Sequence, residues 1–149
     1  SMIKENIARL QYLCDTIPAL LSNIPENDFT HIPAPSKWSK KEILGHLIDS
    51  ATNNHQRFVR AQFEGIPTIV YNQNSWNESS RYIQMDTQHL ILFWTIYNRH
   101  LIELVKRIPH IKLQSKCKTK EGESHTIEWL FDDYVKHLEH HLRQIVGYE

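Results

Sequence analysis

The last part of the chain carries the pattern that most restricts how the protein can fold. Apolar residues recur there at steps of three, four and seven: Ile127, Leu130, Phe131, Tyr134, Leu138 and Ile145. This spacing places them on one face of an α-helix, because a helix has about 3.6 residues per turn. The segment from Ile127 to about Val146 is therefore predicted to be an amphipathic helix that packs against a core.

Two histidines of this helix fall where apolar side chains are expected. On a helical projection His141 lies inside the apolar face and His137 lies at its edge, whereas His140 points away. Burying an imidazole costs free energy unless the ring is hydrogen-bonded or bound to a metal. The two inward rings are four residues apart, like the histidines of metal-binding H-E-x-x-H helices. The alternative is a pair of ordinary histidines, satisfied by backbone carbonyls or exposed at a helix end.

Three further segments show helical periodicity. The first covers residues 3–22 and contains Pro18, which is predicted to bend the helix or end it early. The second covers residues 40–63 and begins at the capping box Ser39-Lys40-Lys41-Glu42. The third covers residues 86–108. Four amphipathic helices with almost no strand pattern predict an all-α fold, a four-helix bundle.

Composition limits the classes of function. The length fits one domain, residues 2–149. Seventeen basic and 17 acidic residues balance, so no net charge attracts the chain to nucleic acid or to an anionic membrane. No apolar run is long enough to span a bilayer, and no signal-peptide pattern is present. Cys14 and Cys117 form no C-x-x-C pair, which suits a reducing compartment. We therefore expect a cytoplasmic protein that binds neither nucleic acid nor membrane.

The segments between the helices are predicted to be loops. Residues 24–38 contain three prolines and no period, and residues 65–81 are rich in amide and aromatic side chains. Long loops are often functional, so Trp76 either lines a pocket or only pins the loop against the bundle. Residues 112–123, with alternating lysines, are predicted to form a solvated loop or a short exposed hairpin, with Cys117 at the surface.

One histidine of the second helix can meet the pair on the last helix. His46 lies at the border of the apolar face, and inward side chains on facing helices of a bundle form cofactor sites. Three histidines with one open position are typical of a catalytic metal centre, so the predicted ligands are His46, His137 and His141. Among the metals that histidines bind, we expect zinc or nickel. The simpler alternative is that His46 hydrogen-bonds a carboxylate such as Asp49.

Three motifs hold these histidines and the long loop between them. They are W-S-K-K-E-I-L-G-H-L-I-D-S at residues 38–50, Y-N-Q-N-S-W at residues 71–76, and the segment at residues 126–145. In this order and spacing they resemble the DinB/YfiT-like superfamily of metal-dependent enzymes. The resemblance covers nearly the whole chain, implies a four-helix bundle, and places the family's metal triad on the same three histidines. Asparagine stands at residues 72 and 74 where many relatives carry aspartate, so no acid role is assigned there.

The resemblance implies a metal-dependent enzyme that acts on a small molecule, either as a hydrolase or as a transferase that uses a low-molecular-weight thiol. A metal with an open position lowers the pKa of bound water or thiol, which makes a nucleophile at neutral pH. No catalytic side chain is assigned. Asp49 and Glu139 are candidates to orient the metal-bound rings, and Arg57 is a candidate to bind a substrate carboxylate. Asn53 and Trp76 are candidates for the substrate pocket.

Two alternatives accompany this interpretation. Arg57 and Glu139 could form ordinary ion pairs near the surface, which contribute little. The whole bundle could be a non-catalytic metal-binding or stress-response interaction module, in which the triad holds a metal for stability alone or holds none. The resemblance also implies a homodimer.

Overall fold

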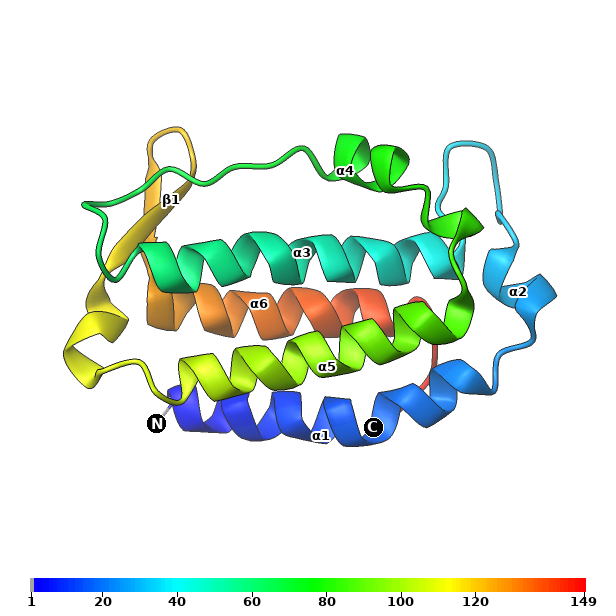
Figure 1. Cartoon of the computed structure of the whole chain (residues 1–149), viewed down its shortest axis with the longest axis horizontal. Helices are drawn as coiled ribbons and strands as arrows, with labels where there is room; N and C mark the ends of the chain where they lie inside the picture. Colours follow the sequence, from blue (N-terminus) through cyan, green and yellow to red (C-terminus); the bar gives the residue numbers. More distant parts are fainter. Residues whose placement is uncertain (1) are drawn as a thin grey trace.

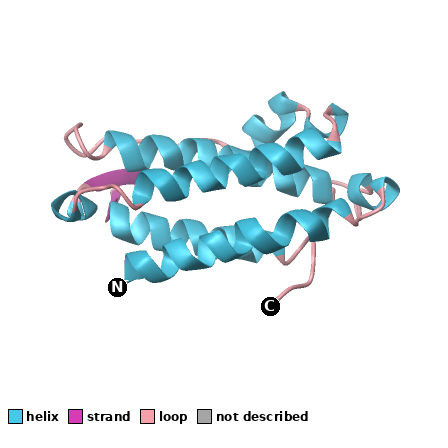
Figure 2. Ribbon diagram, turned by 60° about the horizontal axis from the view of Figure 1, so that its bottom comes forward, coloured by secondary structure: helices cyan, strands magenta, loops and turns pink. Residues whose placement is uncertain are grey.

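Four long helices form the body of the molecule and run side by side (Figures 1 and 2). They are α1 (Met2–Ser22), α3 (Lys40–Arg60), α5 (Thr87–Val105) and α6 (Ile127–Leu142). The computed structural model describes residues 2–149. Both α1 and α3 pack against α5 and α6, so α3 and α6 face each other within the bundle. The predicted four-helix bundle is confirmed.

The ends of the helices agree with the sequence pattern to within a few residues. The capping box of α3 is present: the Ser39 hydroxyl accepts from the amide of Glu42, and the Glu42 carboxylate accepts from the amide of Ser39. This cap fixes the start of α3 and therefore the face on which His46 lies. Pro18 does not end α1, which continues to Ser22.

Shorter elements lie between the long helices. They are α2 (Glu26–Thr30), α4 (Gln73–Ser80), the 3₁₀ turns η1 (Tyr82–Gln84) and η2 (His110–Gln114), and the antiparallel strands β1 (Lys116–Lys120) and β2 (Glu123–Thr126). Two segments predicted to be loops therefore contain helices, α2 and α4. The side chain of Asn72 caps α4 by accepting from the amide of Ser75. Residues 73–80 carry almost no apolar period, so this cap was the only sequence signal for the helix.

Residues 116–126 form the hairpin that was one of the two alternatives for this stretch. The prediction of a surface position for Cys117 is wrong, because its side chain is fully buried. Side chains alternate between the two faces of a strand, and in β1 the face that carries Cys117 is covered. The hairpin also pairs with the segment before α4, where the amide of Ile69 donates to the carbonyl of Lys118 over 2.9 Å.

The core lies between the four long helices, and its largest members are fully buried aromatic side chains. Phe58 of α3 meets Phe131 of α6 edge to face, with ring centroids 5.7 Å apart. Burying a side chain of this size contributes about 1.5–3 kcal/mol to stability. This contact holds together the two helices that carry the three histidines. No helix within residues 2–149 combines the length and the apolar character needed to cross a membrane.

Candidate metal centre

Three histidine side chains converge near the start of α3 and the end of α6. Both of these helix ends lie at the right of Figure 1. The Nε2 atom of His137 lies 3.3 Å from Nε2 of His46 and 3.1 Å from Nε2 of His141. The ring centroids of His46 and His141 are 4.8 Å apart. Within residues 2–149 this is the only group of three or more His, Cys, Asp or Glu side chains placed closely enough to hold a metal ion.

The separations of Nε2 of His137 from Nε2 of His46 and of His141 fit a shared metal ion. Nε2 of a neutral imidazole carries either one proton or one lone pair, so His137 cannot satisfy both neighbours by hydrogen bonding. Zinc binds imidazole nitrogen at about 2.0–2.1 Å, and a tetrahedral site of that size separates its ligand nitrogens by about 3.3–3.4 Å. The observed separations of 3.1 and 3.3 Å are close to this value.

The surroundings keep the rings in the form that binds metal. Burial, followed by the charges of His137 and His141, lowers the pKa of His46 to about 3. Burial, followed by the charges of His141 and His140, lowers the pKa of His137 to about 4. Metals bind the neutral imidazole. These two rings are therefore ready to act as ligands at neutral pH without losing a proton.

His46 is more deeply buried than its border position in the helix indicated. The side chain is fully buried, whereas His137 and His141 are half-buried. Trp38, from the segment before α3, covers His46 with ring centroids 5.0 Å apart. Nδ1 of His46 has no hydrogen-bond partner among the described residues, so the simpler alternative, a bond to Asp49, is not formed.

The two carboxylates expected to orient the rings lie elsewhere. Asp49 accepts a hydrogen bond from the hydroxyl of Tyr82, and its Oδ2 has no partner within residues 2–149. Glu139 accepts two hydrogen bonds from Arg9, at 2.7 and 3.0 Å, and one from Tyr148 at 3.0 Å. Neither carboxylate bonds a ring of the triad in the described structure. Glu139 instead forms the ion pair that was the alternative for it, and joins α1 to α6.

The burial of Asp49 leads to a prediction for stability against pH. Burial raises the pKa of Asp49 to about 6, although the Tyr82 hydrogen bond opposes the rise. The folded state then binds this proton more tightly than the unfolded state, so Asp49 costs stability as pH rises from about 4 to above 6. We expect Asp49→Asn to gain about 1–3 kcal/mol over wild type at pH 8, and much less at pH 4.5. Urea unfolding of the metal-free proteins measures the difference, and a gain that does not depend on pH would contradict it.

Two cavities open on the triad from different sides. His141 lines a cavity of about 420 Å³ together with Trp38, Ile43, Gln73 and Asn74. His137 lines a smaller cavity of about 160 Å³, which we call the Arg57 cavity. Its other lining residues are Ser50, Asn54, Arg57, Tyr71, Asp133 and Tyr134. The histidines are therefore reachable by small molecules along two routes.

Three residues, Asn53, Arg57 and Trp76, were proposed from the sequence for a substrate pocket. Of these, only Arg57 lines a cavity beside the triad. The amide of Asn53 donates to the carbonyl of Asp49 over 2.9 Å, and Trp76 packs by its ring on Tyr71, with centroids 5.9 Å apart. Asn54 was missed, yet it lies three residues before Arg57 and four after Ser50. Helical spacing from Ser50 could have selected it.

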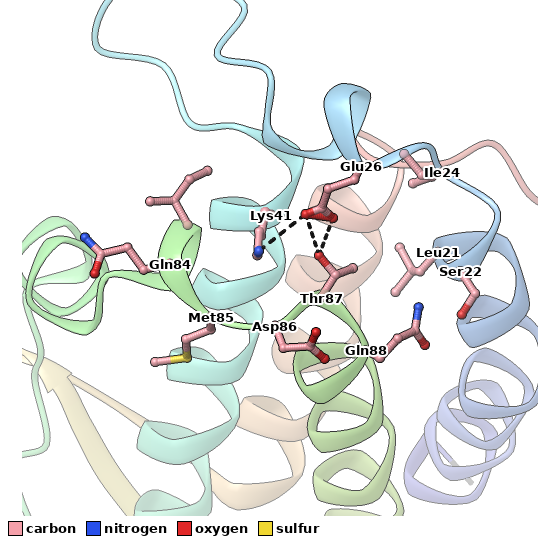
Figure 3. A pocket seen from close by; sticks show the side chains of 11 residues that line it. Leu21, Ser22, Ile24, Glu26, Lys41, Gln84, Met85, Asp86, Thr87 and Gln88 are labelled. Carbon is pink, nitrogen blue, oxygen red and sulfur yellow. Dashed lines mark hydrogen bonds and ion pairs between the residues drawn. The ribbon is translucent and has the colours of Figure 1, made fainter.

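A further cavity is lined by residues that include Glu26, Lys41 and Thr87 (Figure 3). It has a volume of about 660 Å³, and none of the three histidines lines it. Glu26 of α2 spans this cavity, accepting from the hydroxyl of Thr87 and lying 3.6 Å from the buried ammonium of Lys41. These contacts join α2, α3 and α5. We therefore place the candidate site at the triad rather than in this cavity, although it is larger than the two beside the triad.

Comparison with known proteins places the chain in a family. The sequence model of the DinB superfamily matches residues 9–145, which include all three histidines. The chain belongs to the DinB superfamily. The structure of this DinB-superfamily protein is similar to that of YfiT from Bacillus subtilis, described as a probable metal-dependent hydrolase with an unusual four-helix bundle topology. The TM-score is 0.87 at 19% identity, over 96% of this chain and 83% of YfiT. No curated protein sequence matches the chain.

The family resemblance predicted from the motifs is thus confirmed for this DinB-superfamily member. At 19% identity, the likeness to YfiT establishes the shared fold. The chemistry has to be argued from the residues of this chain.

Proposed function

We propose that the protein is a metal-dependent hydrolase of a small molecule, with zinc or nickel held by His46, His137 and His141. The observation that carries the proposal is the convergence of three histidines beside two cavities: Nε2 of His137 lies 3.1–3.3 Å from Nε2 of the other two, and the three ligand atoms all lie within 4.8 Å of one another. A fully buried histidine with two half-buried ones leaves one side of the cluster open. Three histidine ligands with an open position are typical of catalytic zinc, whereas structural zinc sites have four protein ligands.

The residues around the triad have separate tasks in this proposal. The three imidazoles hold the ion, which when bound supplies a Lewis acid that lowers the pKa of water or of a thiol. Trp38 covers His46 on one side and keeps bulk water from that ligand. The Arg57 cavity beside His137 receives the substrate.

A second reaction, transfer of a low-molecular-weight thiol to the substrate, is favoured by one specific observation. Hydrolysis needs room for one organic reactant, but two separate cavities open on the triad. The larger one, about 420 Å³ beside His141, has the apolar side chains of Trp38 and Ile43 together with amides in its lining. A small thiol fits such a mixed surface.

One experiment separates these reactions. The protein is prepared without a polyhistidine tag, stripped with chelator, and reloaded with zinc or nickel. We expect hydrolysis of activated esters and amides that disappears in the stripped protein and returns with metal. Turnover that requires added cysteine or glutathione would show that the reaction is thiol transfer and not hydrolysis. Bound metal that raises thermal stability without supporting any turnover would instead favour the non-catalytic module.

The remaining expectations about partners stay predictions. These are the homodimer, a cytoplasmic location, and the absence of nucleic-acid and membrane partners.

A further inference from the structure

Arg57 is a buried cation that no carboxylate of the described residues contacts at ion-pair distance, although Asp133 lines the same cavity. Its side chain lies on the inner side of α3, and the residue is 9% exposed. None of the ion pairs within residues 2–149 involves it. Its guanidinium stays charged at any physiological pH. A buried charge is costly unless it is paired, so this position needs an explanation.

The hydrogen bonds of Arg57 fix its orientation but use only part of its donors. Nε and Nη2 both donate to the carbonyl of Ile69, at 3.2 and 2.9 Å, and Nη1 donates weakly to Oδ1 of Asn54 at 3.4 Å. The Ile69 carbonyl is itself held by the pairing of its segment with β1. A guanidinium has five N–H groups. Two remain, one on Nη1 and one on Nη2. A carboxylate can accept from these two nitrogens through two parallel bonds when Asn54 uses the other Nη1–H.

A structural role alone does not account for this arrangement. A neutral amide side chain could also donate to the Ile69 carbonyl, without bringing a charge into the interior. The guanidinium also lies 5.9 Å from the ring centroid of Tyr71, which is a weak interaction at this distance. Arg57 lines the same cavity as His137, a ligand of the candidate metal centre. The charge therefore stands next to the proposed reaction site.

We propose that Arg57 binds the carboxylate of the substrate, so that the substrate is a small carboxylic acid whose reacting group lies toward His137. This inference deepens the proposed function and rests on it for the identity of the ligand as substrate. The cavity of about 160 Å³ holds a carboxylate with a few further atoms. Ser50 and Tyr71 also line it and offer hydroxyl groups to the same ligand.

The second charge in the cavity narrows the class of anion. Asp133 also lines the Arg57 cavity and is exposed at its edge. Its negative charge repels a phosphate dianion more strongly than a carboxylate monoanion. We therefore expect monocarboxylates to bind in preference to inorganic phosphate.

The test uses propionate as the probe and the metal-free protein, because a carboxylate could otherwise bind the metal itself. Binding is followed by ¹H–¹⁵N NMR, which reports on the side-chain Nε–H of Arg57, at constant ionic strength. We expect saturable shifts of this signal and of amides around the cavity. Arg57→Gln should weaken binding about tenfold or more, because it removes a charge-assisted pair of hydrogen bonds. Arg57→Lys should also weaken it, since lysine keeps the charge but lacks the fork.

Arg60→Gln is the matched control, because Arg60 lies on the same helix, pairs with Glu64 and lines no part of the Arg57 cavity. It should bind propionate as wild type does. If Arg57→Gln fails to fold, the proposal is tested by two other measurements: the shift of the Arg57 Nε–H signal in wild type, and the propionate affinity of Arg57→Lys. No saturable shift in wild type, unchanged binding by Arg57→Lys, or equal binding of inorganic phosphate would each overturn the proposal.

The failure of this inference can be told apart from the failure of the proposed function. Metal content is measured on the same preparations before the metal is removed. Stoichiometric metal without propionate binding overturns only the role of Arg57. Propionate binding by a protein that takes up no metal supports the Arg57 site and overturns the metal-dependent function.

Discussion

Replacing His141 by alanine is expected to remove most of the metal from the protein, which as wild type should carry about one zinc or nickel ion per chain. Nε2 of His141 lies 3.1 Å from Nε2 of His137, and two histidines are too few to hold an ion tightly. Mutation of a residue that only orients a metal ligand typically lowers the metal affinity about 10–100-fold. Loss of a ligand itself should therefore lower the metal affinity more than about 100-fold. His141 is half-buried, so its truncation leaves no closed cavity in the core.

The measurement is metal content by plasma mass spectrometry, followed by competition with a chelator of known affinity. His140→Ala is the matched control, because His140 is the exposed neighbour in the same turn of α6. It should retain the metal of the wild type. If wild type takes up neither zinc nor nickel, or if His141→Ala binds as tightly as His140→Ala, the triad is not a metal centre. The three rings would then be core histidines of a helical bundle.

Gly45→Ala is expected to destabilise the protein by about 2–4 kcal/mol. A Cβ atom at Gly45 would lie 2.1 Å from Cδ2 of Tyr82, far inside van der Waals contact. The Tyr82 ring cannot move aside freely, because it is 6% exposed and its hydroxyl donates to Asp49. Alanine favours a helix by about 1 kcal/mol over glycine, and this gain offsets only part of the clash. The melting temperature should fall by roughly 5–15 °C.

Urea unfolding of the metal-free proteins tests this prediction. Gly65→Ala serves as the control, since a Cβ atom at Gly65 meets nothing within 4 Å, and its stability should stay within about 0.5 kcal/mol of wild type. Tyr82→Leu should recover part of the loss when it is combined with Gly45→Ala, because the clashing ring is removed. A Gly45→Ala protein as stable as wild type would mean that Tyr82 does not pack on α3 as described.

Helical spacing and end signals were enough to predict the bundle and the meeting of the three histidines. The capping box at Ser39 sets the start of α3, and the apolar period of α6 sets its inner face. Both are local properties of the chain, because the angle between two side chains on a helix depends only on their separation in sequence. Two inward positions on α6 and one on α3 meet because the helices face each other and the start of α3 lies level with the end of α6.

The surroundings of the triad depended on segments that are distant in sequence. Trp38 buries His46, which helical phase alone placed at a border. The carbonyl of Ile69 orients Arg57, and Tyr82 rather than a histidine engages Asp49. These partners come from irregular segments and short helices with no apolar period. Without a period, the sequence does not show which way their side chains point. Helix geometry thus determined which three histidines are the candidate ligands. The tertiary packing of the connecting segments decided that Trp38 covers His46 and that the charge of Arg57 is held beside His137.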